Sequence, residues 1–237
     1  MATSRRLAFT LAALLAIPVF AQSQVVANPD QMSVITIVGE INTQSVGMLL
    51  SVVNSQVRMG VKKIRIVIAS GGGDPSAGFS AYNYLRGLKD VEISTFNMGN
   101  VDSAAVLLFC AGQNRYSVPG ARFVLHGNSL TTSGPTMMDA SMLQGNFEII
   151  KNLNQMVVQV LSSTVNKDKK TDIENAIHGQ TILSAEDAVK WGLVKEIRSN
   201  FMEPGAMLVT VSAPAPSSET KPPVQFTSTT PNANNKN

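Results

Sequence analysis

The sequence predicts an α/β protein in which a mostly parallel sheet is covered by helices. Residues 33–41 (SVITIVGEI) and 62–69 (KKIRIVIA) are near-continuous apolar runs rich in β-branched side chains, as in strands buried on both faces. Residues 44–59, between them, carry apolar side chains at helical spacing. Strand, helix and strand in that order form the repeating unit of a parallel sheet.

The rest of the chain continues this alternation. A helix is expected over residues 75–88, because Asp74 is a good N-cap and Pro75 suits the first helical position. The other expected elements are, in order, a strand at 92–98, a turn at Gly99, a helix at 103–111, a strand at 121–126 (ARFVLH), a long helix at about 138–165, two short helices with capping boxes at Thr171 and Ser184, and a strand at 193–197.

The N-terminus has the features of a secretory signal. Arg5 and Arg6 precede an apolar run at residues 7–20, which is short for a bilayer span and ends in small residues. We expect residues 1–21 to be a signal peptide cut after Ala21, and the protein to be exported, either periplasmic or secreted. An uncleaved anchor is the alternative.

Composition divides the remaining chain. Residues 22–32 are expected to form a linker and residues 33–200 one domain. From residue 201 to 237 Pro, Ser, Thr and Asn dominate, which predicts a disordered tail apart from a short apolar patch at 207–211.

Charge and cysteine content exclude several classes of function. Without Arg5 and Arg6, 17 basic side chains remain against 16 acidic ones. The net charge is then only about +1, so no nucleic-acid partner is expected. The single cysteine, Cys110, lies in an apolar segment and is interpreted as a small buried hydrophobe. The two histidines belong to no zinc-binding motif, so neither a metal nor another cofactor is predicted.

Three groups of residues follow the carboxyl ends of predicted strands: the glycines 71–73, Ser103 and His126. In a parallel sheet these ends share one edge, where ligands bind. The glycine loop is either a tight turn or a set of oxyanion donors, and it lacks the Lys-Ser/Thr of a phosphate loop. Ser103 is either a helix cap or a nucleophile, and His126 is either structural or a base. Together they suggest acyl-transfer chemistry.

Four segments resemble the Clp-type proteolytic subunits. IASGGGDPSAGFSAYNYL resembles their "SPGG…AG…IYD" segment, and MGNVDSAAVLLFCAG resembles their "MGQAASMGAFLLAAG" nucleophile segment. ARFVLH is similar to "ARVMIH", and LSAEDAVKWGLV to "LSAPEAVEYGLV". The resemblance covers residues 33–198. It implies the fold shared by Clp peptidases, signal-peptide peptidases and crotonases, with repeated β-β-α units and a long handle helix.

The resemblance assigns roles to individual residues. It places the nucleophile at Ser103, the general base at His126, and the oxyanion hole at the backbone N–H groups of Gly73 and Ala104. The family's orienting aspartate falls on Gln180, which can accept a hydrogen bond from the imidazole but cannot stabilise an imidazolium by charge.

Other departures and alternatives remain open in the sequence. Asp102 replaces a small residue beside the nucleophile, where its charge would oppose an oxyanion unless it points away or pairs with His126. The signal-peptide peptidase branch uses a lysine base, for which Lys151 is the nearest downstream candidate. His178 could also approach the site, although a helix-end histidine is the simpler interpretation.

The resemblance implies a serine peptidase that cuts peptides or unfolded proteins and assembles as a homo-oligomer through the helix at 138–165. The predicted signal peptide adds that this peptidase is exported. An exported protein would lack a cytosolic ATPase partner, so ATP-independent action is expected. A catalytically weak or inactive scaffold of the same fold is the first alternative, since Gln180 stands where the acid belongs. Crotonase-type acyl-CoA chemistry is the second.

Overall fold

The computed structural model describes residues 31–130 and 137–212. The predicted signal peptide, most of the predicted linker, residues 131–136 and the predicted tail beyond 212 lie outside these residues. The helices are α1 (Thr43–Arg58), α2 (Pro75–Gly87), α3 (Ala105–Cys110), α4 (Ala140–Thr164), α5 (Lys170–His178) and α6 (Ala185–Lys190). The strands are β1 (Met32–Val38), β2 (Lys63–Ser70), β3 (Glu92–Asp102), β4 (Asn114–Ser117), β5 (Arg122–His126), β6 (Gln180–Ser184), β7 (Glu196–Ile197) and β8 (Met207–Ser212).

One eight-stranded sheet organises the described residues. Its main path is β6-β5-β3-β2-β1-β8, with β4 pairing with both β3 and β7. All these pairings are parallel except that of β5 with β6. The predicted α/β class with a mostly parallel sheet covered by helices is therefore confirmed.

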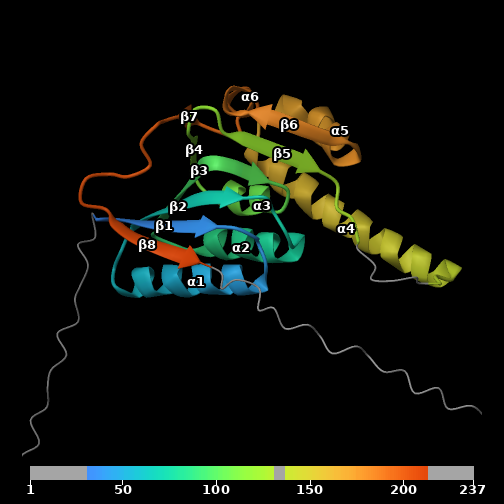
Figure 1. The fold of residues 1–237 in the computed structure, drawn as a ribbon, viewed down its shortest axis with the longest axis horizontal. Coiled ribbons are helices and arrows are strands. Elements are labelled where there is room, and N and C mark those ends of the chain that lie inside the picture. Colours follow the sequence, from blue (N-terminus) through green and yellow to red (C-terminus); the bar gives the residue numbers. More distant parts are fainter. Residues whose placement is uncertain (1–30, 131–136, 213–237) are drawn as a thin grey trace, which may run out of the picture.

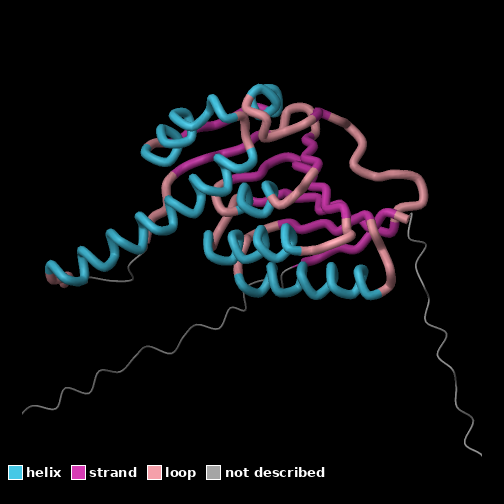
Figure 2. Tube along the Cα trace, turned by 180° about the vertical axis from the view of Figure 1, so that it is seen from behind, coloured by secondary structure: helices cyan, strands magenta, loops and turns pink. Residues whose placement is uncertain are grey.

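Helices α1, α2 and α3 lie side by side on one face of the sheet. Helix α4 runs past this layer, and one end of it extends away from the sheet (Figures 1 and 2). The main core lies between this layer and the sheet. Its largest fully buried side chains include Leu49, Ile66, Phe109 and Phe123. Burial of this apolar surface is the main source of the fold's stability.

The other face of the sheet carries a smaller apolar cluster built on Val34, Val67, Phe96 and Tyr116. The segment after β7 covers it, with Phe201 edge-on to Phe96 at 6.0 Å between ring centroids. The buried guanidinium of Arg65 fixes this segment by donating to the Phe201 carbonyl oxygen and to Glu203.

Strand β3 is longer than predicted, because it does not turn at Gly99. The register against β2 shifts between Ile68 and Ser70, so β3 carries a bulge, and the strand then continues to Asp102. Its first half pairs with β4 and its last three residues pair with β5. The following helix consequently begins at Ala105 rather than at Ser103.

Several short elements differ from the expectations. Ser184 caps α6 as predicted, since its Oγ accepts from the N–H of Asp187. The box predicted at Thr171 is wrong: α5 already begins at Lys170 and has no side-chain cap. The sheet also extends past residue 200, where the sequence places the end of the domain, because β8 pairs along β1.

Cys110 is buried in α3, which agrees with its interpretation as a small hydrophobe. Burial raises the pKa of its thiol to about 11, against a smaller opposing effect of the Arg115 charge. Since the thiolate is the reactive form, Cys110 is not a nucleophile at neutral pH. None of the described helices is both long and apolar enough to cross a membrane.

Candidate active site

Ser103 occupies a sharp turn between β3 and α3. Its φ is +53°, and among the described non-glycine residues only Asp90 also has a positive φ. The Ser103 N–H donates to the Val124 carbonyl oxygen at 2.7 Å, which ties the turn to β5. A serine held in a strained strand-to-helix turn is the arrangement of many hydrolase nucleophiles, because the turn presents the hydroxyl at the edge of the sheet.

The three glycines after β2 differ in their surroundings. A Cβ on Gly72 would lie 2.6 Å from the Ser103 Cβ and 3.1 Å from the Ala104 nitrogen. A Cβ on Gly73 would lie 2.3 Å from the Ile41 carbonyl oxygen, whereas one on Gly71 would meet nothing within 4 Å. Any larger residue at position 72 or 73 would clash with neighbouring atoms, and the loop packs directly on the serine turn.

Two backbone N–H groups beside the serine have no hydrogen bond within the described residues. They belong to Gly73 and Ala104, the two positions that the resemblance assigns to the oxyanion hole. The neighbouring donors are used, since the Gly72 N–H bonds the Ser70 Oγ and the Asp74 N–H bonds the Ile41 carbonyl oxygen. Unbonded N–H groups on a closely packed loop are suited to receive a developing negative charge.

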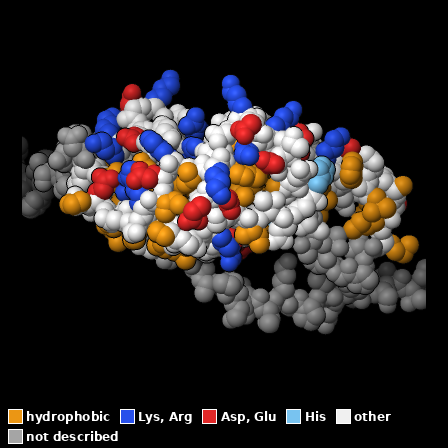
Figure 3. Space-filling model, turned by 90° about the horizontal axis from the view of Figure 1, so that it is seen from above, with side chains coloured by type: hydrophobic (Ala, Val, Ile, Leu, Met, Phe, Trp, Pro, Cys, Tyr) orange, Lys and Arg blue, Asp and Glu red, His pale blue; other side chains and the backbone are white. Residues whose placement is uncertain are grey.

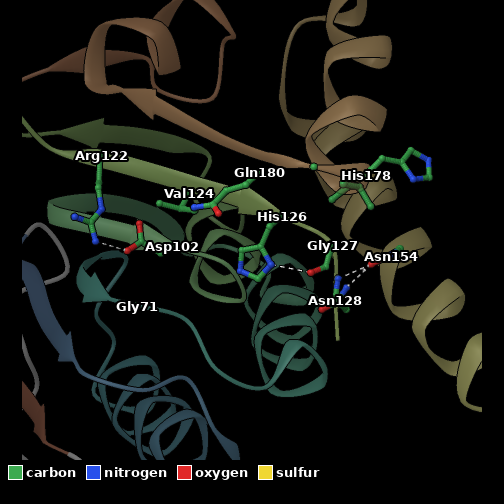
Figure 4. Close-up of a pocket in the computed structure, with 12 residues that line it drawn as sticks. Gly71, Asp102, Arg122, Val124, His126, Gly127, Asn128, Asn154, His178 and Gln180 are labelled. Atoms are coloured by element: carbon green, nitrogen blue, oxygen red, sulfur yellow. Dashed lines mark hydrogen bonds and ion pairs between the residues drawn. The ribbon is translucent and has the colours of Figure 1, made fainter. Parts of the chain in front are cut away.

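His126 ends β5, and its half-buried imidazole donates from Nδ1 to the Gly127 carbonyl oxygen at 2.7 Å. A carbonyl oxygen only accepts, so this bond requires hydrogen on Nδ1. In the neutral ring Nε2 is then unprotonated, which is the state that a general base needs. Figure 4 shows the imidazole and its contact with Gly127.

Gln180 begins β6 directly opposite His126 in the antiparallel β5–β6 pair. Its side chain is exposed and forms no hydrogen bond with the imidazole. The predicted position of Gln180 beside the histidine is thus observed, but the hydrogen bond expected of an orienting residue is formed by the Gly127 carbonyl oxygen instead.

A cavity of about 670 Å³ opens beside His126 and Gln180, and Ser103 is not among the residues that line it. Its lining residues come from the loop after β2, the end of β3, β5, α4, α5 and the start of β6, among them Gly71, Asp102, Arg122, His126, Asn154 and Gln180. Within the described residues no hydrogen bond joins the Ser103 hydroxyl to His126. The structure therefore brings the predicted groups to one edge without forming the nucleophile–base contact.

Asp102, the residue before the serine, does not pair with His126. Its Oδ2 accepts from Arg122 at 3.0 Å and from the Asn100 side chain at 3.1 Å, while its buried Oδ1 has no partner. The Asp102 side chain is 10% exposed and that of Arg122 is 58% exposed. Arg122 thus neutralises the charge beside the candidate nucleophile.

This pairing predicts opposite effects for two substitutions. Arg122→Gln leaves a buried carboxylate next to the oxyanion site, so acylation of Ser103 by a fluorophosphonate is expected to slow by about tenfold. Adding Asp102→Asn to that variant removes the charge and restores most of the rate. A double variant as slow as Arg122→Gln alone would mean that the carboxylate charge has no part in the effect.

Neither alternative base reaches the site. Lys151 lies on an exposed part of α4 and pairs with Glu148 at 3.5 Å. His178 lines the cavity at the end of α5, but Figure 4 shows its imidazole directed away from His126. The described part of the chain contains no cluster of three or more side chains placed to hold a metal ion.

Sequence reasoning missed two contributors, Arg122 and Asn154. Alternation along ARFVLH does place Arg122 on the same face as His126, so this residue could have been found. Asn154 is a polar residue within the apolar stripe of the predicted long helix, and its role depends on a contact 26 positions away.

Comparison with known proteins points to one family. A family model described as Clp protease matches residues 22–201. The ATP-dependent Clp protease proteolytic subunit 2 of Borreliella burgdorferi is 33% identical over 141 residues, which cover 57% of this chain and 67% of that protein. Subunit 1 of the same name from Chlamydia felis is 28% identical over 144 residues, covering 59% and 66%. The alignments thus span about two-thirds of these relatives.

The fold comparison extends further along the chain. A ClpP1 mutant from Listeria monocytogenes superimposes with a TM-score of 0.61 at 21% identity, covering 71% of this chain and 92% of that one. At this identity the likeness establishes the fold alone. Since the family model covers most of the sequence, the chain belongs to the Clp protease family.

Proposed function

We propose that this chain is a serine peptidase that hydrolyses peptides or unfolded proteins through an acyl-enzyme formed on Ser103. The observation that carries the proposal is the strained Ser103 turn, packed on Gly72 and flanked by the unbonded N–H groups of Gly73 and Ala104. Strained backbone conformations of this kind cluster at functional sites.

Each residue has the role that is usual in catalysis by a serine nucleophile. Ser103 Oγ attacks the peptide carbonyl carbon while His126 Nε2 takes the hydroxyl proton. The N–H groups of Gly73 and Ala104 stabilise the oxyanion, and the imidazolium then protonates the leaving amine. A water molecule, deprotonated by the same Nε2, cleaves the ester and regenerates the serine. Because Oγ and the imidazole are not bonded in the isolated chain, the two groups have to move into contact before attack.

Assembly is proposed to occur through α4, since the Clp protease family generally forms homo-oligomers. Apolar side chains on the projecting half of this helix are exposed: Met142, Leu143, Phe147 and Ile149. Figure 3 shows hydrophobic side chains gathered at the end of the molecule to which this part of the helix projects. An exposed apolar patch of this kind is typical of a protein interface.

The α4 interface predicts that charge on its apolar face dissociates the assembly. The double variant Leu143→Glu, Phe147→Glu is expected to reduce the particle mass to that of the monomer in light scattering, because desolvating two carboxylates opposes association. The control variant Ser141→Glu, Asn152→Glu adds the same charge at exposed polar positions and keeps the assembly. Equal masses for wild type and the apolar-face variant would exclude α4 as the interface.

Export and independence of an ATPase complete the proposal. They rest on the basic and apolar N-terminal segment at residues 5–21, because an exported protein has no access to cytosolic ATP-driven partners. The curated relatives carry "ATP-dependent" in their names, so this chain would differ from them in how substrate is delivered.

Hydrolysis of a fluorescently labelled, permanently unfolded protein tests the activity. Cleavage without ATP by the assembled wild-type protein, its loss in Ser103→Ala and its loss in His126→Ala are the expected results. Cleavage that persists in Ser103→Ala would rule out the proposed nucleophile.

A specific observation also favours a second candidate, a binding or scaffold protein with weak or no activity. Gln180 supplies no charge to His126, and no hydrogen bond joins the imidazole to Ser103. A wild-type protein that assembles and binds unfolded chains without cutting them would match this candidate.

A further inference from the structure

The loop that follows the candidate base is held by α4. Asn128 directly follows the His126–Gly127 pair, and both its backbone N–H and its side-chain amide donate to the Asn154 Oδ1, at 2.8 and 2.9 Å. Figure 4 shows these two bonds beside the contact between His126 and Gly127. A single side-chain oxygen on a helix thus fixes the chain two residues after the imidazole.

A second contact holds the same loop from α5. A Cβ on Gly127 would lie 2.4 Å from the Ile177 carbonyl oxygen and 3.6 Å from the Asn154 Nδ2. Only glycine allows the loop to approach the last turn of α5 this closely. Gly127 is therefore confined between α4 and α5, and its carbonyl group has little freedom to move.

The confined carbonyl oxygen is the acceptor of the His126 Nδ1 hydrogen at 2.7 Å. We propose that the Gly127 carbonyl oxygen, held by Asn154, orients the imidazole and keeps Nε2 as the unprotonated nitrogen, the task usually given to an acidic side chain. Asn154 is then a positioning residue that acts through the loop. This inference rests on the proposed peptidase function of Ser103.

The other groups near the ring do not serve this task. Gln180 is exposed and unbonded to the imidazole, although it lies directly across the strand pair. The Asp102 carboxylate is engaged by Arg122, and His178 is directed away from His126. Within the described residues, the Gly127 carbonyl oxygen is thus the one observed hydrogen-bond partner of the His126 imidazole.

Nitrogen-15 NMR of the histidine side chains tests the orientation directly, because it identifies which ring nitrogen carries hydrogen in the neutral form. His178→Gln assigns the two histidine signals. The Nδ1–H form is expected for His126 in the assembled wild-type protein, and a mixture with the Nε2–H form in Asn154→Ala. Asn154→Asp keeps the acceptor oxygen and should keep the Nδ1–H form. A wild-type Nε2–H form, or an Nδ1–H form unchanged in Asn154→Ala, would overturn the proposal.

Fluorophosphonate labelling of Ser103 gives the second readout. The rate constant is expected to fall on the order of 10²-fold in Asn154→Ala, as for a displaced catalytic group. It should largely recover in Asn154→Asp and remain unchanged in Gln155→Ala, the adjacent exposed amide on α4. Gln180→Ala should lose much less of the labelling rate than Asn154→Ala does; an equal loss would assign the orienting role to Gln180 instead.

The two readouts separate the possible failures. If Ser103 is never labelled, the peptidase function fails, while the NMR spectra still decide which group orients His126. If Asn154→Ala does not fold by circular dichroism, Asn128→Ala removes one of the two loop bonds. It should give a smaller shift in the same direction, and no shift in that variant would count against the proposal.

Discussion

Replacing Arg115 with alanine is expected to lower the free energy of unfolding by about 3 kcal/mol and the melting temperature by about 10 °C. The guanidinium donates to four backbone carbonyl oxygens. These oxygens lie at or just after the carboxyl ends of three different helices. They belong to Gly112 after α3, Thr164 in the last turn of α4, and Gly192 and Leu193 after α6, at 2.7 to 3.4 Å. Helix carboxyl ends carry partial negative charge, so one cation stabilises all three.

Arg86 supplies the matched control for this prediction. It lines the same small cavity as Arg115 but is exposed and makes no hydrogen bond or ion pair with another described residue. Arg86→Ala should change the free energy of unfolding by less than about 0.5 kcal/mol. Arg115→Lys should fall between the two, because an ammonium cannot reach the same set of acceptors. Thermal denaturation followed by circular dichroism measures all three, and equal losses in both alanine variants would contradict the account.

Gly72→Ala is expected to reduce the labelling of Ser103 by more than about 10²-fold while most of the fold remains. The new Cβ would lie 2.6 Å from the Ser103 Cβ and 2.8 Å from the Asp102 carbonyl oxygen, and the φ of +97° is itself strained for alanine. The serine turn and the Ala104 N–H must therefore move.

The neighbouring glycine provides a control one residue away. A Cβ on Gly71 meets nothing within 4 Å, and its φ is not positive. Gly71→Ala should label at the wild-type rate, with the folded state of both variants checked by circular dichroism. A Gly72→Ala protein that labels like wild type would mean that the loop does not shape the serine turn.

The main sheet could be predicted because its strands are long and apolar and are separated by amphipathic helices, as in β1, α1 and β2. Strands β4 and β6 were missed because NRYS and QTILS are short and carry polar side chains. The place of β8 beside β1 depends on a pairing between residues about 170 positions apart, for which a local pattern gives no signal.

For the candidate site, the sequence predicts which groups come together but not the contacts between them. Parallel topology alone brings the glycine loop, Ser103 and His126 to one edge, since each follows a strand. The unusual φ of Ser103 and the contact with Gly72 arise from the way β3 turns into α3 against the loop, which sequence spacing does not specify. The partner of the His126 imidazole could not be predicted either. It is a backbone carbonyl oxygen, a group that every residue carries, so the sequence does not single it out.

Mass spectrometry of the assembled wild-type protein after incubation with a fluorophosphonate tests the central claim most directly. The account predicts one added phosphonyl group per chain, mapped by peptide analysis to Ser103, and no addition in Ser103→Ala or in protein unfolded with urea. An assembled, folded protein that takes up no phosphonyl group, or takes it up at another residue, would contradict it.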